Sequence, residues 1–140
     1  MIVKNVFDVA KSAMSAQMVR LNTVSSNMAN AQTVSDTKEG AYRPLRPVFE
    51  TVYGDQMGQA GRDGLSTTRV REVVTLDREP VRAYRPDHPM ADEEGFVYES
   101  VVNTDEEMVE MLEASRQYQN VLETVSTLRT LMARTVKMGQ

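Results

Sequence analysis

Few residues of this sequence have the types and the spacing that catalysis requires. His88 is the single histidine, and it stands between Pro86 and Pro89. A histidine that binds a metal or transfers a proton needs partners within reach, so an isolated one in this setting indicates a turn residue. A hydrolase that depends on His88 remains one hypothesis. The variant His88→Ala tests it, and we expect that variant to affect association with other chains at most.

The other candidates for chemistry are no stronger. The acidic run Asp92–Glu94 lacks the spacing of a calcium loop and is typical of a solvated turn. Three glycines, Gly58, Gly61 and Gly64, do not lead from a strand into a helix, which excludes a phosphate-binding loop. Tyr118 has the position of a packing residue. We therefore expect no catalytic, cofactor-binding or metal-binding residue, no cofactor and no enzymatic activity.

Composition and charge narrow the class of protein further. The net charge is −4, and basic residues are mixed with acidic ones, which argues against a nucleic-acid partner. The chain has no cysteine and no Trp, 6% aromatic residues and ten methionines, so a large rigid core is not expected. The sequence contains no run of about 18 apolar residues, so we expect no membrane-spanning segment. The first residues lack the apolar run of a cleaved signal, so we expect a cytosolic chain or one exported without cleavage.

Glycine and proline divide the sequence into three parts. All five prolines lie between Gly40 and Gly95, and the flanking segments are almost free of both residue types. We expect an N-terminal helix and connector at 1–39, a β-rich middle at 40–99 with a mobile loop at 54–64, and a C-terminal helix at 100–140. Within the middle, the expected extended segments are 41–53, 67–76, 81–84 and 96–98, with 81–84 the hairpin partner of 67–76.

The two end segments predict long helices with a narrow apolar stripe. Residues 106–137 form a helix of roughly 48 Å at about 1.5 Å per residue, started by a Thr104–Glu107 capping box. Residues 5–30 form the other, with Asn5 as its cap. Apolar or small residues recur in alternating steps of three and four, the coiled-coil period. The stripes are Val3, Phe7, Ala10, Met14, Gln17, Leu21, Val24, Met28 and Ala31, and Met111, Ala114, Tyr118, Val121, Val125, Leu128 and Met132.

These stripes predict an α+β protein whose terminal helices pair as an antiparallel coiled coil, with the β-rich middle at the far end from the termini. The N-terminal helix also carries a polar face with few charges, where a solvated face would carry Glu and Lys. Such a face is typical of contact with further helices, as in a tube of many copies. Its members are Ser12, Ser15, Asn22, Thr23, Ser25, Ser26, Asn27 and Asn30.

Several segments resemble the rod and hook axial proteins of the bacterial flagellum. The segments are 6–17, 20–22, 25–31, 42–44, 47–50, 84–91, 95–97, 102–109 and 115–119, in that order along almost the whole chain. The residues that carry the motif are Asn27, Ala29, Asn30, Tyr84, Pro86, His88 and Pro89. The stretch 84–91 and the short length are similar to a proximal-rod member. Hook and distal-rod relatives place Gly-Tyr soon after the 25–31 segment, whereas Gly40 comes late here, so the path of the 31–40 connector is not predicted from them.

The resemblance implies a structural subunit of the proximal rod, which polymerises through its terminal helices into the drive shaft that transmits motor torque. It implies the periplasmic part of the basal body as its location and export through the flagellar type III apparatus without a cleaved signal. The implied partners are copies of itself, the proximal-rod subunits FlgB and FlgF, the junction protein FliE and the distal-rod protein FlgG, without nucleic acid or membrane insertion.

The alternative hypothesis is a soluble helical-hairpin adaptor or export chaperone that binds a single client. We expect an adaptor to have stable helices as an isolated chain, and an axial subunit to have frayed or disordered ends until it polymerises.

Overall fold

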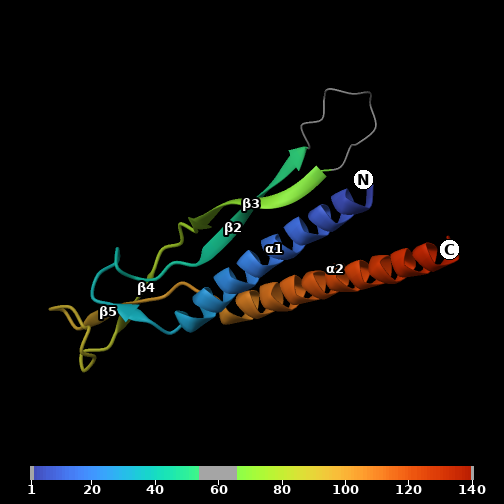
Figure 1. The fold of residues 1–140 in the computed structure, drawn as a ribbon. Coiled ribbons are helices and arrows are strands. Elements are labelled where there is room, and N and C mark those ends of the chain that lie inside the picture. Colours follow the sequence, from blue (N-terminus) through green and yellow to red (C-terminus); the bar gives the residue numbers. More distant parts are fainter. Residues whose placement is uncertain (1, 54–65, 140) are drawn as a thin grey trace.

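A computed structural model describes residues 2–53 and 66–139, and the expected loop at 54–64 lies outside these ranges. Two long helices, α1 (Ile2–Ala29) and α2 (Thr104–Met138), run antiparallel and bring the two termini to the same end (Figure 1). Between them in the sequence, the described residues form five strands. These are β1 (Val34–Ser35), β2 (Leu45–Tyr53), β3 (Ser66–Thr75), β4 (Val81–Tyr84) and β5 (Phe96–Glu99). The predicted α+β class with paired terminal helices is confirmed.

The starts of both helices differ from the prediction. α1 begins at Ile2, so Asn5 lies inside the helix and does not cap it. α2 is capped by Asn103, whose side-chain oxygen accepts hydrogen bonds from the backbone N–H groups of Asp105 and Glu106. The predicted cap, Thr104 in a box with Glu107, is therefore wrong by one residue. Asparagine caps a helix as well as threonine does, and Asn103 comes one position earlier in the chain. Glu107 is freed for a different contact.

Strands β2 and β3 form a long antiparallel hairpin that runs back along α1 toward the termini (Figure 1). Two predictions are wrong here. Strand β3 pairs with β2 and not with 81–84, and both β2 and β3 lie beside α1 instead of beyond its far end. The hairpin covers part of the polar face of α1, where Thr23 and Asn27 are buried. The Ser12 hydroxyl donates a hydrogen bond to the carbonyl oxygen of Thr68 on β3.

A small sheet of order β1-β5-β4 lies at the end of the molecule away from the termini. The turn between β4 and β5 contains His88, whose Nδ1 accepts a hydrogen bond from the Met90 N–H at 3.1 Å. Asp92 closes the same turn by accepting from the N–H groups of Glu94 and Phe96. These backbone contacts hold the pKa of Asp92 below its ordinary value. Both residues thus act as turn formers.

Gly95 ends this turn with a positive φ of 80°, a conformation that side chains disfavour. A Cβ added there would lie 3.0 Å from a Tyr84 ring carbon and 3.1 Å from the Cβ of Pro86. Gly95→Ala is therefore expected to destabilise the fold by about 1–3 kcal/mol, measured from urea unfolding followed by tyrosine fluorescence. Gly139→Ala is the control, because its φ is −93° and its nearest neighbours lie 3.7 Å away. Equal unfolding midpoints for Gly95→Ala and the unchanged chain would contradict this role.

The core of the described molecule is small. Its buried apolar side chains are Ala10, Ala16, Val24, Ala41, Val97 and Ala114. Small side chains let the two helices approach closely but bury little apolar area each. Neither helix in the described ranges is long and apolar enough to cross a membrane. The stability of this chain therefore rests to an unusual degree on polar contacts and on whatever covers its exposed apolar residues.

Candidate assembly interface

The helices α1 and α2 pack along each other, and three residues of the predicted stripes are buried. Val24 and Ala114 are fully buried, and Ala10 nearly so. The larger stripe residues are half-buried, and they are Phe7, Met14, Leu21, Met28, Met111, Tyr118, Val121, Val125 and Leu128. Met132, close to the end of α2, is 39% exposed. A single pair of helices thus leaves the larger members of its own stripe partly in water.

Two polar contacts fix the register of the helix pair. The Gln17 side-chain amide donates to Oε1 of Gln117 at 2.9 Å, which explains the polar position in the α1 stripe. Oε1 of Gln17 is buried without a hydrogen-bond partner among the described residues. One turn on, the Arg20 guanidinium donates twice to Oε2 of Glu110, at 2.6 and 2.9 Å. A slip of either helix would break these contacts, so they specify one alignment.

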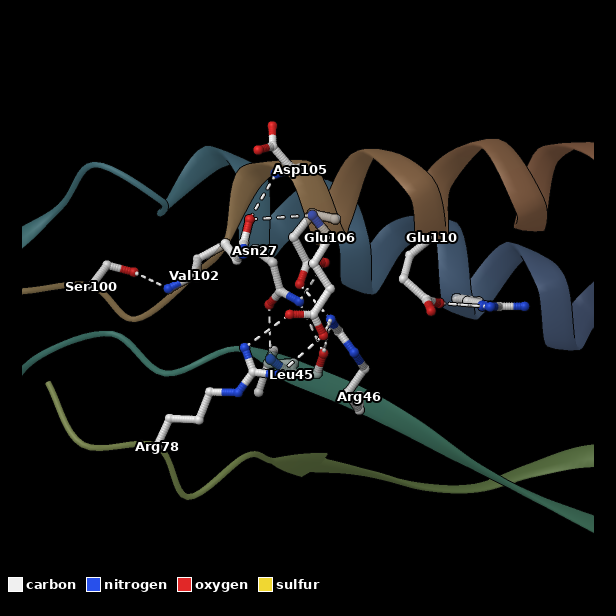
Figure 2. A network of polar contacts seen from close by, with 12 residues as sticks. Asn27, Leu45, Arg46, Arg78, Ser100, Val102, Asp105, Glu106 and Glu110 are labelled. Atoms are coloured by element: carbon white, nitrogen blue, oxygen red, sulfur yellow. Dashed lines mark hydrogen bonds and ion pairs between the residues drawn. The ribbon is translucent and has the colours of Figure 1, made fainter.

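A partly buried cluster, which we call the polar clasp, joins α1, β2, the segment after β3 and α2 at the end of the helix pair away from the termini. Its members are Asn27, Arg46, Arg78, Glu106 and Glu107 (Figure 2). The Asn27 side chain uses its full hydrogen-bonding capacity. Its Nδ2 donates to the Leu45 carbonyl at 2.9 Å and to Oε2 of Glu107 at 3.0 Å. Its Oδ1 accepts from the Leu45 N–H at 2.8 Å and from the Tyr42 hydroxyl at 3.0 Å. One side chain thereby docks β2 on α1 as a neighbouring strand would.

The acidic half of the clasp is held by two arginines. Glu107 is 1% exposed, and its Oε1 lies 2.6 Å from Nη2 of Arg46. Glu106, nearer the surface, makes a two-pronged contact with Arg78, 3.0 Å at each oxygen. The hydrogen bonds from Arg78, aided by its charge and by Arg46, lower the pKa of Glu106 below its ordinary value. Because the carboxylate of Glu107 is buried, removing the charge of Arg46 alone would destabilise the fold.

The sequence contains a signal for the clasp that lies one turn before the predicted stripe of α2. Glu107 stands four residues before Met111 and so continues the apolar stripe of α2 into its first turn. A charge on a buried stripe requires a partner, and this pattern could have pointed to one. From its spacing alone, Asn27 is predicted to lie on the polar face of α1. The clasp brings it to Glu107, a contact between residues 80 positions apart.

The remaining motif residues are dispersed. Ala29 is exposed, and the Asn30 side chain donates to the carbonyl of Ser26 within the last turn of α1. Tyr84 is 65% exposed, although its ring edge contacts Phe96. Pro86 and Pro89 are exposed, and His88 is half-buried in its turn. The structure therefore unites Asn27 with the clasp and leaves the 84–89 motif in the small sheet.

A groove of about 530 Å³ runs between α1 and α2, which we call the α1–α2 groove. Its apolar lining comes from Phe7, Met14, Met18, Tyr118, Leu122 and Val125, and the charged residues Asp8, Lys11 and Arg129 line it as well. α2 also exposes large apolar side chains elsewhere, among them Met108, Val109, Leu112, Leu131 and Val136. Exposed apolar surface on this scale in a small chain marks contact with other molecules.

The chemistry of an enzyme site is not found in these surfaces. Across residues 2–53 and 66–139, no three His, Asp or Glu side chains gather as a metal site would require. The charged groups with the clearest pKa shifts are bound in ion pairs or turns, as in the clasp and at Asp92. The geometry is that of a scaffold with apolar faces.

Comparison with known proteins places these features in context. The family model of the flagella basal body rod protein matches residues 7–34, and that of the flagellar basal body rod FlgEFG protein C-terminal region matches residues 93–138. The chain is 38% identical to flagellar basal-body rod protein FlgC of Yersinia enterocolitica, over 97% of both chains. It is 34% identical to FlgC of Salmonella typhimurium (strain LT2) over the full length of both. It is 33% identical to FlgC of Aquifex aeolicus, over 94% of this chain and 92% of the relative.

Proposed function

We infer that this chain, which belongs to the FlgC family of flagellar basal-body rod proteins, is a structural subunit of the proximal rod. The observation that carries this function is similarity to FlgC relatives along the full chain. The two family models cover α1 and the α2 region, the two elements that form the helix pair. Its place is the flagellar basal body.

We propose that the subunit works by burying the exposed sides of its helix pair among neighbouring subunits. The half-buried stripe residues and the α1–α2 groove support this role. Their apolar side chains stay partly exposed in the single chain, and packing against another chain would bury them. Torque would pass through many apolar contacts between subunits, which together resist shear. These contacts would supply the packing that the small core of a single chain does not. No catalytic step is needed for that task, and we propose that the protein is not an enzyme.

The proposal extends to partners and location. Rod assembly requires copies of this chain and contact with other rod components, for which we propose FlgB, FlgF, the junction protein FliE and distal-rod FlgG. We further propose that the chain is exported through the flagellar type III apparatus and assembles in the periplasm. The absence of cysteine suits an assembly that does not depend on disulfides.

The alternative, a soluble adaptor for a single client, is less well supported. An adaptor needs one binding face, whereas this chain exposes apolar residues both in the groove and on the outer side of α2. Several faces suit a subunit that has neighbours on several sides. Stable helices throughout the isolated chain, measured by circular dichroism, would favour the adaptor.

The test of the function is direct localisation. Deleting the gene for this chain is expected to abolish swimming, and a plasmid copy is expected to restore it. Basal bodies purified from the restored cells should contain the chain in the rod, seen as traceable α1 and α2 density by electron cryo-microscopy. Swimming cells whose basal bodies lack the chain would refute the proposed function.

A further inference from the structure

The helix α2 has an exposed surface near its start that matches the α1–α2 groove in chemistry. Residues Asp105, Met108, Val109, Leu112 and Glu113 recur at helical spacing on its outer side, and we call them the α2 patch. Met108, Val109 and Leu112 are 52%, 62% and 67% exposed. Along its length α2 packs against α1, and β2 reaches it through Arg46 at Glu106 and Glu107. In Figure 1 no other labelled helix or strand runs along α2 on the side away from α1.

Charge is distributed unevenly along α2. The α2 patch lies in the first turns of the helix, and the groove lining on α2 runs from Tyr118 to Arg129. All acidic residues of the helix lie at or before Glu123, and only Arg129, Arg134 and Lys137 carry charge after it. The α2 patch begins with the carboxylate of Asp105 and ends with that of Glu113, and Arg116 lies beyond it. The α1–α2 groove is lined by Lys11 and Arg129 together with one acid, Asp8.

The two surfaces are therefore complementary in both respects that govern association. Each offers exposed apolar side chains, and the charges that border them are opposite in net sign. Within one chain they cannot meet. Met108 in the patch and Leu122 in the groove lie on the same helix, about 21 Å apart at about 1.5 Å per residue.

We propose that the α2 patch of one subunit docks in the α1–α2 groove of a second copy of this chain. The inference rests on the proposed function and names a surface and a partner for it. The contact is heterologous, because patch meets groove and neither meets itself. A pair of copies thus keeps one free groove and one free patch, and the contact continues from copy to copy along a rod.

The absence of cysteine makes this contact open to cross-linking. A disulfide requires Cα atoms within about 7 Å, so Met108→Cys and Leu122→Cys in the same chain cannot react with each other. After mild oxidation of basal bodies from cells with the double variant, we expect covalent dimers and longer multimers of this chain on a non-reducing gel. Each single variant is expected to remain monomeric, and cells that make both single variants are expected to give dimers.

Two matched controls make the result specific. Met108→Cys with Leu131→Cys replaces the groove position by one that is 52% exposed but does not line the groove, and it should give few multimers. Adding Arg129→Glu to the cysteine pair should lower the yield of multimers about two- to fivefold, the effect of reversing an exposed charge contact. Arg134→Glu, in the same basic half but not in the groove lining, should leave the yield unchanged.

Each other outcome is decisive. If cells with the double variant swim and their basal bodies contain the chain without multimers, the contact is overturned and the proposed function stands. A cross-link to a different polypeptide would overturn the second copy as the occupant. Should the cysteine pair prevent assembly, swimming of Arg129→Glu is compared with Arg134→Glu, and equal swimming overturns the contact. A chain missing from basal bodies of swimming cells would instead refute the function.

Discussion

Arg46→Met is expected to destabilise the folded chain by about 3–5 kcal/mol, because it leaves the carboxylate of Glu107 buried without its cation. Glu107 is 1% exposed, and Nη2 of Arg46 is 2.6 Å from it. Methionine replaces the length of the arginine stem but none of its donors. The loss is measured at neutral pH from urea unfolding followed by circular dichroism.

A second change distinguishes a lost ion pair from lost packing. Arg46→Met combined with Glu107→Gln should recover most of the stability, since the neutral amide keeps an acceptor for Asn27 and needs no cation. Arg71→Met is the control on β3, where the arginine side chain is 65% exposed and lies 3.8 Å from Glu72. Its expected effect is within about 0.5 kcal/mol. If Arg46→Met unfolded at the same urea concentration as the unchanged chain, the clasp would not stabilise the fold.

Val125→Asp is expected to abolish swimming and to remove the chain from basal bodies. Val125 lies half-buried on the α2 stripe and lines the α1–α2 groove with Phe7. A carboxylate there would lose its water in a contact that offers it no partner, at a cost of about 1–3 kcal/mol or more in each subunit. The cost recurs at every copy in the rod. Leu128→Asp, one turn further on the same stripe, is expected to act alike.

The readouts are the diameter of swimming halos in soft agar and detection of the chain in purified basal bodies. Asn120→Asp supplies the matched control, because it adds the same carboxylate to the same helix at an exposed position outside the stripe and the groove lining. It should leave swimming unchanged. Normal swimming with both Val125→Asp and Leu128→Asp would show that this part of the stripe is not needed for assembly.

The sequence predicted the two helices well because their pattern is local. A stripe repeated every 3.5 residues and the absence of glycine and proline are read within each helix, and the two patterns together imply antiparallel pairing. The strand partners could not be predicted in the same way. The segments 67–76 and 81–84 are close in sequence, which favoured a hairpin between them, whereas β3 pairs with β2 across residues 54–65. The partner and register of β3 depend on how the strands pack against α1. No pattern within the strand itself predicts this packing.

The clasp is not predicted from the sequence for a related reason. Asn27 and Glu107 have separate local explanations, a polar helix face and a capping box, and both explanations are satisfied without a contact between them. Only the tertiary structure shows that the asparagine amide takes the place of a backbone strand and that Asn103 provides the cap. Local rules fail where one side chain has two possible roles.

The separation of the clasp partners along the chain has a temporal consequence. Asn27 meets Leu45 after 18 further residues and Glu107 only after 80. A polypeptide emerges from the ribosome N-terminus first, so the clasp cannot close until the last quarter of the chain has appeared. Before that point the Asn27 side chain has its partners Leu45 and Tyr42 available but not the carboxylate of Glu107.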